Sequence, residues 1–345
     1  MSTAEIVFDA LQHVTFGSLS EFNRLGVLPL MAREDRAAGY ATLDEAMARG
    51  WMKITEVTEA GHVPELKVEN SGDTAVLIVD GEELVGAKQN RVVNLTMLIP
   101  ARKTMVIPVS CVESGRWRHT SREFASAPRV QYAEGRAAKM QNVTASLRSD
   151  SSSRRSNQGE VWSLIAEKAS RLDAPSPTSA MSSMYEVHGG SIDEFVKAFT
   201  PGERQVGAVF FINGRVAGLE LFDAASTWRA ISPKLVRSYA IDAIDRPRAE
   251  AATPSPESAK AFCTALASSA GSTFPATGMG DDVRLTGVQV ITNSENAFLA
   301  TEGDLGQKVM AAMEAARVYG GDGRCSCSEV FPTSCGCPPA ATIES

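Results

Sequence analysis

The chain has 345 residues, a length that suits two ordinary domains or one large domain. Hydrophobic residues make up 43% and charged residues 22%, which excludes disordered, collagen-like and coiled-coil classes. Lysine and arginine number 34 against 41 aspartates and glutamates, so the formal charge is −7 and no global attraction to nucleic acid or to an anionic membrane is expected.

The start of the chain and its hydropathy favour a cytoplasmic protein. The first residues lack the basic region of a signal peptide, and Asp9, Gln12 and His13 interrupt the apolar residues that follow. No stretch approaches the ~18 consecutive apolar residues of a membrane-spanning helix. We therefore expect a cytoplasmic protein that does not associate with membranes and whose thiols are mostly reduced.

The first 145 residues are predicted to be rich in strands. Thr42 and Glu45 have the spacing of a capping box at the start of a short helix. From Trp51 to Trp117, short apolar and β-branched runs predict a series of strands, and Asp80-Gly81 is a favoured two-residue hairpin turn. Residues 1–145 should therefore form a mainly antiparallel, β-rich half.

The rest of the chain divides into a loop, a mixed half and a tail. Residues 146–158 are rich in serine and arginine, which predicts an exposed loop. Residues 159–319 combine helical and strand patterns, with Asn213-Gly214 as the strongest short hairpin signal. Residues 320–345 should form a flexible, cysteine-rich tail. The predicted fold class is α+β, with the mixed half packed against the β-rich half.

A dense polar segment follows Asp80-Gly81. Its amide and charged side chains can recognise phosphate, carboxylate or ribose hydroxyl groups. The candidate ligand-binding residues are Glu82, Glu83, Lys88, Gln89, Asn90 and Arg91. The alternative is a solvated hairpin end that protects a sheet edge. The segment is not a P-loop, because no Gly-Lys-Ser/Thr pattern leads into a helix.

A second cluster contains the components of an activated thiol. Cys111 and Glu113 lie two residues apart, and arginines close by in the sequence could lower a thiol pKa. His119 or His188 could act as the partner base, with His188 the better distant candidate. The alternative is that Cys111 is buried as a small hydrophobic residue.

Four stretches of the chain resemble the ARG and Rhodanese-Phosphatase-superfamily-associated Protein domain. They are residues 81–91, 108–117, 158–162 and 205–223. The resemblance extends from about Phe22 to Ala300. The family's name records an association with ADP-ribosylglycohydrolases and rhodanese/phosphatase-type proteins. It implies a setting in ADP-ribose or nucleic-acid-end metabolism, and it supplies no catalytic residues.

The tail contains four cysteines in two Cys-X-Cys pairs. Four thiolates can bind one tetrahedral zinc ion, although zinc sites usually place two or more residues within each pair. The predicted ligands are Cys325, Cys327, Cys335 and Cys337. A disulfide pair and an unstructured, metal-free tail are the competing interpretations.

These patterns leave three classes of function open. The leading hypothesis is a ligand-binding or accessory protein for a nucleotide-like small molecule, linked to ADP-ribose or RNA-end metabolism. The runner-up is a thiol-dependent hydrolase or transferase that uses Cys111, and the third is a non-catalytic scaffold. Nucleic acid is not the favoured partner, because the chain is acidic and contains no recognised binding module.

Overall fold

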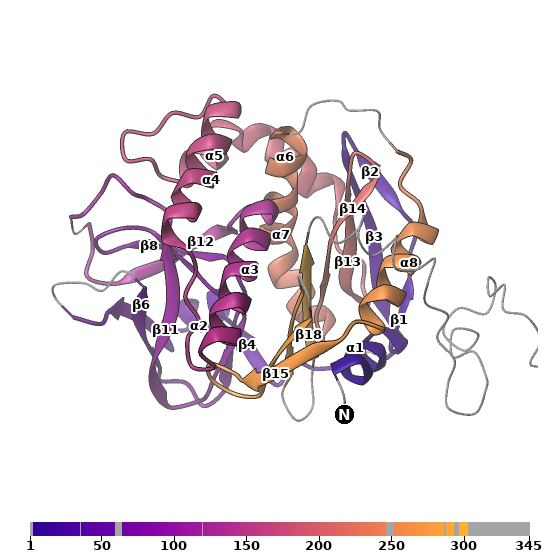
Figure 1. Cartoon of the computed structure of the whole chain (residues 1–345), viewed down its shortest axis with the longest axis horizontal. Coiled ribbons are helices and arrows are strands. Elements are labelled where there is room, and N and C mark those ends of the chain that lie inside the picture. The colour runs from indigo at the N-terminus through magenta and orange to yellow at the C-terminus, as the bar shows by residue number, and fades with distance from the viewer. Residues whose placement is uncertain are drawn as a thin grey trace, which may run out of the picture.

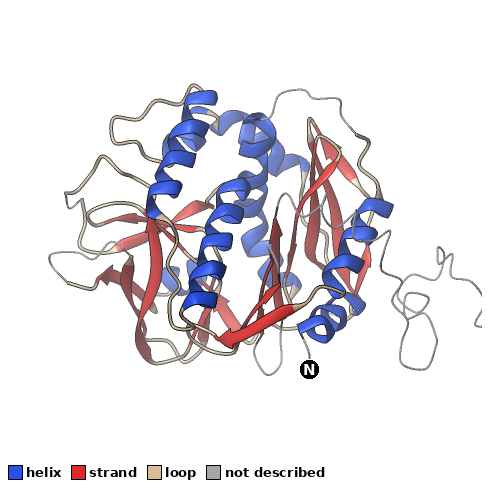
Figure 2. Ribbon diagram, in the orientation of Figure 1, coloured by secondary structure: helices blue, strands red, loops and turns tan. Residues whose placement is uncertain are grey.

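The computed structural model describes residues 3–34, 36–58, 64–118, 120–245, 252–285, 288–292 and 297–302. It is an α+β protein whose described strands pair antiparallel, apart from one parallel pair, which confirms the predicted fold class. Two sheets flank a central layer of helices, and further helices cover the outer face of one sheet (Figures 1 and 2).

A six-stranded sheet curls until its two edge strands meet. Its strand order is β12, β8, β9, β11, β6, β5. Contacts join β12 to β5, and Lys53 on β5 pairs with Glu123 beside β12 at 2.7 Å. The strands are β5 (Met52–Glu56), β6 (Glu65–Asn70), β8 (Glu82–Gly86), β9 (Arg91–Val93), β11 (Lys103–Cys111) and β12 (Phe124–Val130). A small sheet of β4 (Tyr40–Thr42), β7 (Ala75–Ile78) and β10 (Met97–Ile99) shares its apolar core.

The larger sheet draws strands from both ends of the chain. Its order is β1, β3, β13, β14, β18, β17, β16, β15, with β2 paired to β3. The strands are β1 (Val14–Phe16), β2 (Ser20–Phe22), β3 (Leu25–Ala32), β13 (Gln205–Ile212), β14 (Arg215–Leu221), β15 (Gly271–Pro275), β16 (Asp281–Leu285), β17 (Val288–Thr292) and β18 (Ala297–Glu302). Residues 14–32 therefore belong to the sheet of the second half, and the two predicted halves interlock.

Helices cover both faces of the larger sheet. The central layer contains α3 (Ala133–Ser149), α4 (Gln158–Arg171) and α7 (Ala225–Asp245), and the outer face carries α1 (Thr3–Gln12) and α8 (Pro256–Ala267) (Figure 2). On β13, Phe210 stacks on Tyr239 of α7 at 3.9 Å, whereas Phe211 packs in the core formed with α1 and α8. Burial on both faces explains why β13 is a continuous apolar run.

Two local predictions are confirmed. The Thr42 hydroxyl and the Glu45 side chain form the complete capping box at the start of α2 (Leu43–Ala48). Asn213 and Gly214 join β13 to β14 with φ angles of +50° and +75°, as a tight hairpin turn requires.

The Asp80-Gly81 pair forms a turn, but the predicted hairpin is wrong. Strand β7 before the turn pairs with β4 and β10, whereas β8 after it pairs with β9 and β12, so the chain crosses between sheets. Lys139 of α3 bonds to Asp80 at 2.7 Å, and both side chains are fully buried. The turn is therefore anchored in the interior instead of facing solvent.

The serine- and arginine-rich loop is shorter than the predicted range of residues 146–158. Helix α3 continues to Ser149 and α4 begins at Gln158, whose side-chain amide binds the backbone of Cys111 through two hydrogen bonds of 2.8 Å. Two short helices, α5 (Ser182–Val187) and α6 (Gly189–Ala198), follow α4. No helix within the described ranges is long and apolar enough to cross a bilayer.

Candidate functional site

Five of the six predicted ligand residues are buried, and Lys88 is partly exposed. Glu82 accepts hydrogen bonds from Lys234 Nζ at 2.7 Å and from the Val79 amide at 2.8 Å. Burial raises the pKa of Glu82, and the Lys234 charge opposes that rise. Glu83 pairs with Arg129 and accepts a hydrogen bond from Asn90. These acids hold the interior together.

The amides of this segment bind other parts of the protein. Gln89 donates to the Glu113 carbonyl at 2.9 Å, and its own oxygen accepts from Arg91 at 3.1 Å. The Asn90 side-chain oxygen accepts from Arg116 at 2.9 Å. Burial lowers the pKa of Arg91, although the guanidinium stays the ionised partner of nearby acids. The structure thus brings these predicted residues together, with their polar atoms largely turned toward the protein.

Cys111 is fully buried beside Gln89 and Glu113. Its sulfur donates to the Gln89 side-chain oxygen at 3.0 Å. Burial raises the pKa of the Cys111 thiol, although hydrogen bonds at the sulfur and the Arg91 charge favour the thiolate. Burial also opposes ionisation of Glu113, but hydrogen bonds from Arg116 and Thr178 outweigh it and lower the pKa of that carboxyl. In this arrangement the thiol is protonated at neutral pH.

The proposed histidine partners are not joined to Cys111 in the structure. His188 donates from Nε2 to the Leu172 carbonyl at 2.8 Å, and among the described residues no hydrogen bond or ion pair links it to Cys111 or Glu113. His119 lies outside the described residues. The catalytic assignment therefore stays a prediction.

The tail cysteines also lie outside the described residues. Elsewhere, in the part of the chain that the structure describes, no three His, Cys, Asp or Glu side chains are placed to hold a metal ion. The zinc site stays a prediction.

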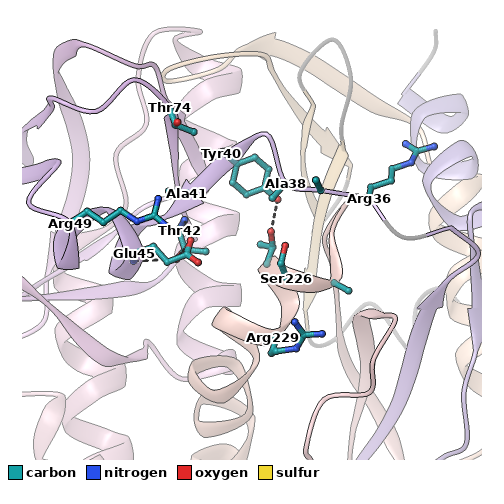
Figure 3. Close-up of a pocket in the computed structure, with 13 residues that line it drawn as sticks. Arg36, Ala38, Tyr40, Ala41, Thr42, Glu45, Arg49, Thr74, Ser226 and Arg229 are labelled. Carbon is teal, nitrogen blue, oxygen red and sulfur yellow. Dashed lines mark hydrogen bonds between the residues drawn. The ribbon is translucent and has the colours of Figure 1, made fainter.

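A cavity of about 550 Å³ lies at the junction of β4, α2 and the first turns of α7 (Figure 3). This volume falls within the range of about 300–1,000 Å³ that small-molecule sites occupy. Its lining combines arginines, hydroxyl groups and small apolar side chains. The lining residues are Arg36, Ala37, Ala38, Tyr40, Ala41, Thr42, Glu45, Arg49, Thr74, Ala225, Ser226, Thr227 and Arg229.

Three exposed arginines surround this cavity, with Arg49 and Arg36 on opposite sides of Tyr40 (Figure 3). The Arg49 guanidinium lies 4.7 Å from the centre of the Trp51 ring, and Arg229 donates to a backbone carbonyl at 3.3 Å. Among the described residues, no carboxylate forms an ion pair with any of the three arginines. Arg49 and Arg229 are therefore available to an anionic ligand, whereas the Arg36 charge also acts on Asp223, where it opposes the rise that burial causes in the pKa of that carboxyl.

The wall between the arginines is built from hydrogen-bonded hydroxyl groups. The Tyr40 hydroxyl donates to the Asp223 carboxylate and accepts from Thr227 at 2.8 Å. Burial, and then the Asp223 charge, raise the pKa of Tyr40 well above its usual value, so this hydroxyl stays protonated. The first turn of α7, which starts at Ala225, faces the cavity, and helical geometry leaves its amides without intrahelical acceptors. Such helix starts attract anions.

Sequence reasoning missed this cavity. Its arginines come from a loop, from the end of α2 and from α7, so no motif joins them. The one sequence signal within the cavity lining is the Thr42–Glu45 capping box, which predicted where α2 begins.

The fold and the cavity define an α+β protein with an arginine-lined pocket. The chain belongs to the ARG and Rhodanese-Phosphatase-superfamily-associated Protein domain family, whose model matches residues 13–311. No curated protein and no solved structure is significantly similar to it.

Proposed function

We propose that this protein is a ligand-binding accessory protein whose arginine-lined pocket takes a phosphate-bearing, nucleotide-like small molecule such as ADP-ribose. The observation that carries the proposal is the set of three arginines without carboxylate partners around one cavity of about 550 Å³. Guanidinium groups bind phosphate through paired N–H donors, and the start of α7 adds backbone donors of the same kind.

The chemistry of the lining supports a binding role. Hydroxyl groups of Thr74 and Ser226 can bond ribose or phosphate oxygens, and the alanines leave room for a ring. Arginines on opposite sides of Tyr40 place positive charge on two sides of the cavity, between which a diphosphate can be held (Figure 3). The family association with ADP-ribosylglycohydrolases, implied by the family's description, agrees with this ligand class.

Isothermal titration calorimetry of the intact protein tests the proposal. ADP-ribose and ADP should bind, and adenosine, which lacks phosphate, should bind at least about tenfold more weakly. Replacing Arg229 with Gln should weaken ADP-ribose binding about tenfold, since one charged contact is lost. Arg102→Gln is the matched control, because Arg102 is an exposed arginine paired with Asp73 at 2.7 Å.

Two results would contradict the proposal. One is the absence of heat from ADP-ribose and ADP with folded protein. The other is an equal loss of affinity in Arg229→Gln and Arg102→Gln, which would indicate a general charge effect.

A further inference from the structure

Among the described residues, Glu45 is the one acidic side chain in the lining of the arginine-lined pocket. It is exposed, and it lies between Arg49 and the first turn of α7 (Figure 3). The other charged side chains in the described lining are arginines. A carboxylate repels phosphate, so a pocket that binds phosphate alone gains nothing from this residue. The presence of Glu45 therefore favours a ligand that also carries hydrogen-bond donors.

The capping box orients the Glu45 carboxylate and uses only one of its two oxygens. Oε2 accepts from the Thr42 amide at 2.8 Å and from the Thr42 hydroxyl at 3.0 Å. In the part of the chain that the structure describes, Oε1 has no hydrogen-bond partner. An ionised carboxylate accepts hydrogen bonds and donates none. Glu45 thus offers an acceptor whose position is already fixed, which lowers the entropy cost of binding a donor.

Glu45 and Arg49 are neighbours on α2, but they do not neutralise each other. Residues four positions apart on a helix have Cβ atoms about 5–6 Å apart, and an acid followed by a base is the favourable order for an ion pair. The structure shows no such pair between these two described residues, because each is held elsewhere. The Arg49 guanidinium lies 4.7 Å from the centre of the Trp51 ring, and Glu45 bonds to Thr42. A cation and an acceptor therefore line the cavity one helical turn apart.

A ribonucleotide carries the groups that complement this arrangement. Its phosphates accept hydrogen bonds from guanidinium groups, and the 2′- and 3′-hydroxyls at the other end of the ribose can donate. In dinucleotide-binding folds an aspartate or glutamate accepts from a ribose hydroxyl in this way. A sugar without these hydroxyls would leave the Glu45 charge close to the phosphates with no compensating contact.

We propose that Glu45 makes the pocket specific for ribonucleotides, because its carboxylate accepts hydrogen bonds from the ribose 2′- and 3′-hydroxyls while Arg49 and Arg229 bind the phosphates. This inference rests on the proposed function, since it assigns one part of the same pocket. It adds a specificity that the arginines alone do not supply.

Calorimetry with ADP and 2′,3′-dideoxy-ADP tests this role. The unaltered protein should bind ADP about tenfold more tightly than dideoxy-ADP, as hydrogen bonds to a charged acceptor predict. In Glu45→Gln the ADP affinity should fall about tenfold, and the ratio between the two nucleotides should fall to about twofold or less. Glutamine keeps an oxygen for the Thr42 amide, so α2 should persist, and thermal unfolding of the same samples checks this.

Glu160→Gln is the matched control. Glu160 is also an exposed glutamate at the third position of its helix, α4, and it lies outside the pocket lining. This variant should keep the preference for ADP over dideoxy-ADP. Loss of the preference in both variants would overturn the assignment to Glu45.

Pyrophosphate distinguishes contact with the sugar from contact with the phosphates. It has the diphosphate charge but no diol, so Glu45→Gln should leave its affinity unchanged or raise it, because a repelling charge is removed. A loss of pyrophosphate affinity as large as the loss for ADP would show that Glu45 acts on phosphate through a bound cation, and would overturn the proposal.

The remaining outcomes separate this inference from the proposed function. Equal affinity of the unaltered protein for ADP and dideoxy-ADP, or a ratio that Glu45→Gln does not change, would overturn the role of Glu45 and leave the phosphate-binding pocket standing. Absence of binding by both ADP and ADP-ribose would reject the proposed function itself.

Discussion

Two groups of charged residues in this protein differ in the partners that they have. Around the 80–91 segment, buried cations pair with buried acids, Lys234 with Glu82 and Lys139 with Asp80, both at 2.7 Å. Around the cavity, Arg36, Arg49 and Arg229 are exposed and form no ion pair with the described acids. The comparison teaches that a dense polar segment can serve the fold, and it is the scattered set of unpaired charges that we propose as the binding site.

Removing a buried cation should have the largest effect on stability. In Lys234→Met, the Glu82 carboxylate stays buried without its 2.7 Å partner, and Asp44 also loses its contact with the ammonium. The free energy of unfolding should fall by about 3–5 kcal/mol, as measured by urea denaturation. Lys53→Met, which breaks an exposed pair with Glu123, is the control and should leave the midpoint nearly unchanged. Similar losses in both variants would show that burial is not the deciding difference.

Alkylation tests whether Cys111 belongs with the buried group. Burial raises the pKa of this thiol, and burial raises the pKa of Cys263 to about 12, so neither forms an exposed thiolate at neutral pH. Iodoacetamide should modify both at least about 100-fold more slowly in the native protein than after denaturation, as mass spectrometry of peptides would report. Rapid native modification of Cys111 alone would instead support the thiol-enzyme hypothesis.

The pH dependence of stability tests the ion pair of Glu113. Burial opposes its ionisation, but its hydrogen bonds lower the pKa below the unfolded value. A carboxyl whose pKa is lowered by folding stabilises the protein at pH values above its pKa in the unfolded state, about 4.3. That contribution is lost as the pH falls through its pKa in the folded state. The stability difference between the protein and Glu113→Gln should therefore be constant from about pH 7 to about pH 5 and shrink below about pH 4. A difference that grows in acid would contradict the assignment.

Lys88 gives the smallest expected effect and separates the two candidate binding regions. It is the one predicted ligand residue that is partly exposed, and its ammonium lies 5.3 Å from the centre of the Trp117 ring. If the pocket binds ADP-ribose, Lys88→Gln should leave the calorimetric affinity within about twofold of the original. A tenfold loss would return the ligand to the 82–91 residues predicted from the sequence.

The sequence predicted what depends on neighbouring residues. The capping box of Thr42 and Glu45 and the Asn213-Gly214 hairpin each follow from contacts within a few residues. The sequence did not predict helix α3, because its buried side includes Arg136 and Lys139 and so shows no apolar stripe. The partners of these two residues, Glu220 and Asp80, lie in distant parts of the chain.

The features that the sequence did not predict correctly depend on contacts between distant parts of the chain. The Asp80-Gly81 turn has the composition of a hairpin, and only the Lys139 contact from α3 reveals why it joins two sheets. The pocket could not be predicted either, because Arg49 and Arg229 are 180 residues apart and meet only through the packing of α2 and α7 beside Tyr40.

The most direct test of the central claim is ADP-ribose calorimetry on the double variant Arg49→Gln/Arg229→Gln, with thermal unfolding measured on the same sample. Because both arginines are exposed and face the cavity, the affinity should fall by about 100-fold or more, while the unfolding midpoint should stay within about 2 °C of the original. Unchanged affinity in this folded double variant would contradict the claim that the unpaired arginines form the ligand site.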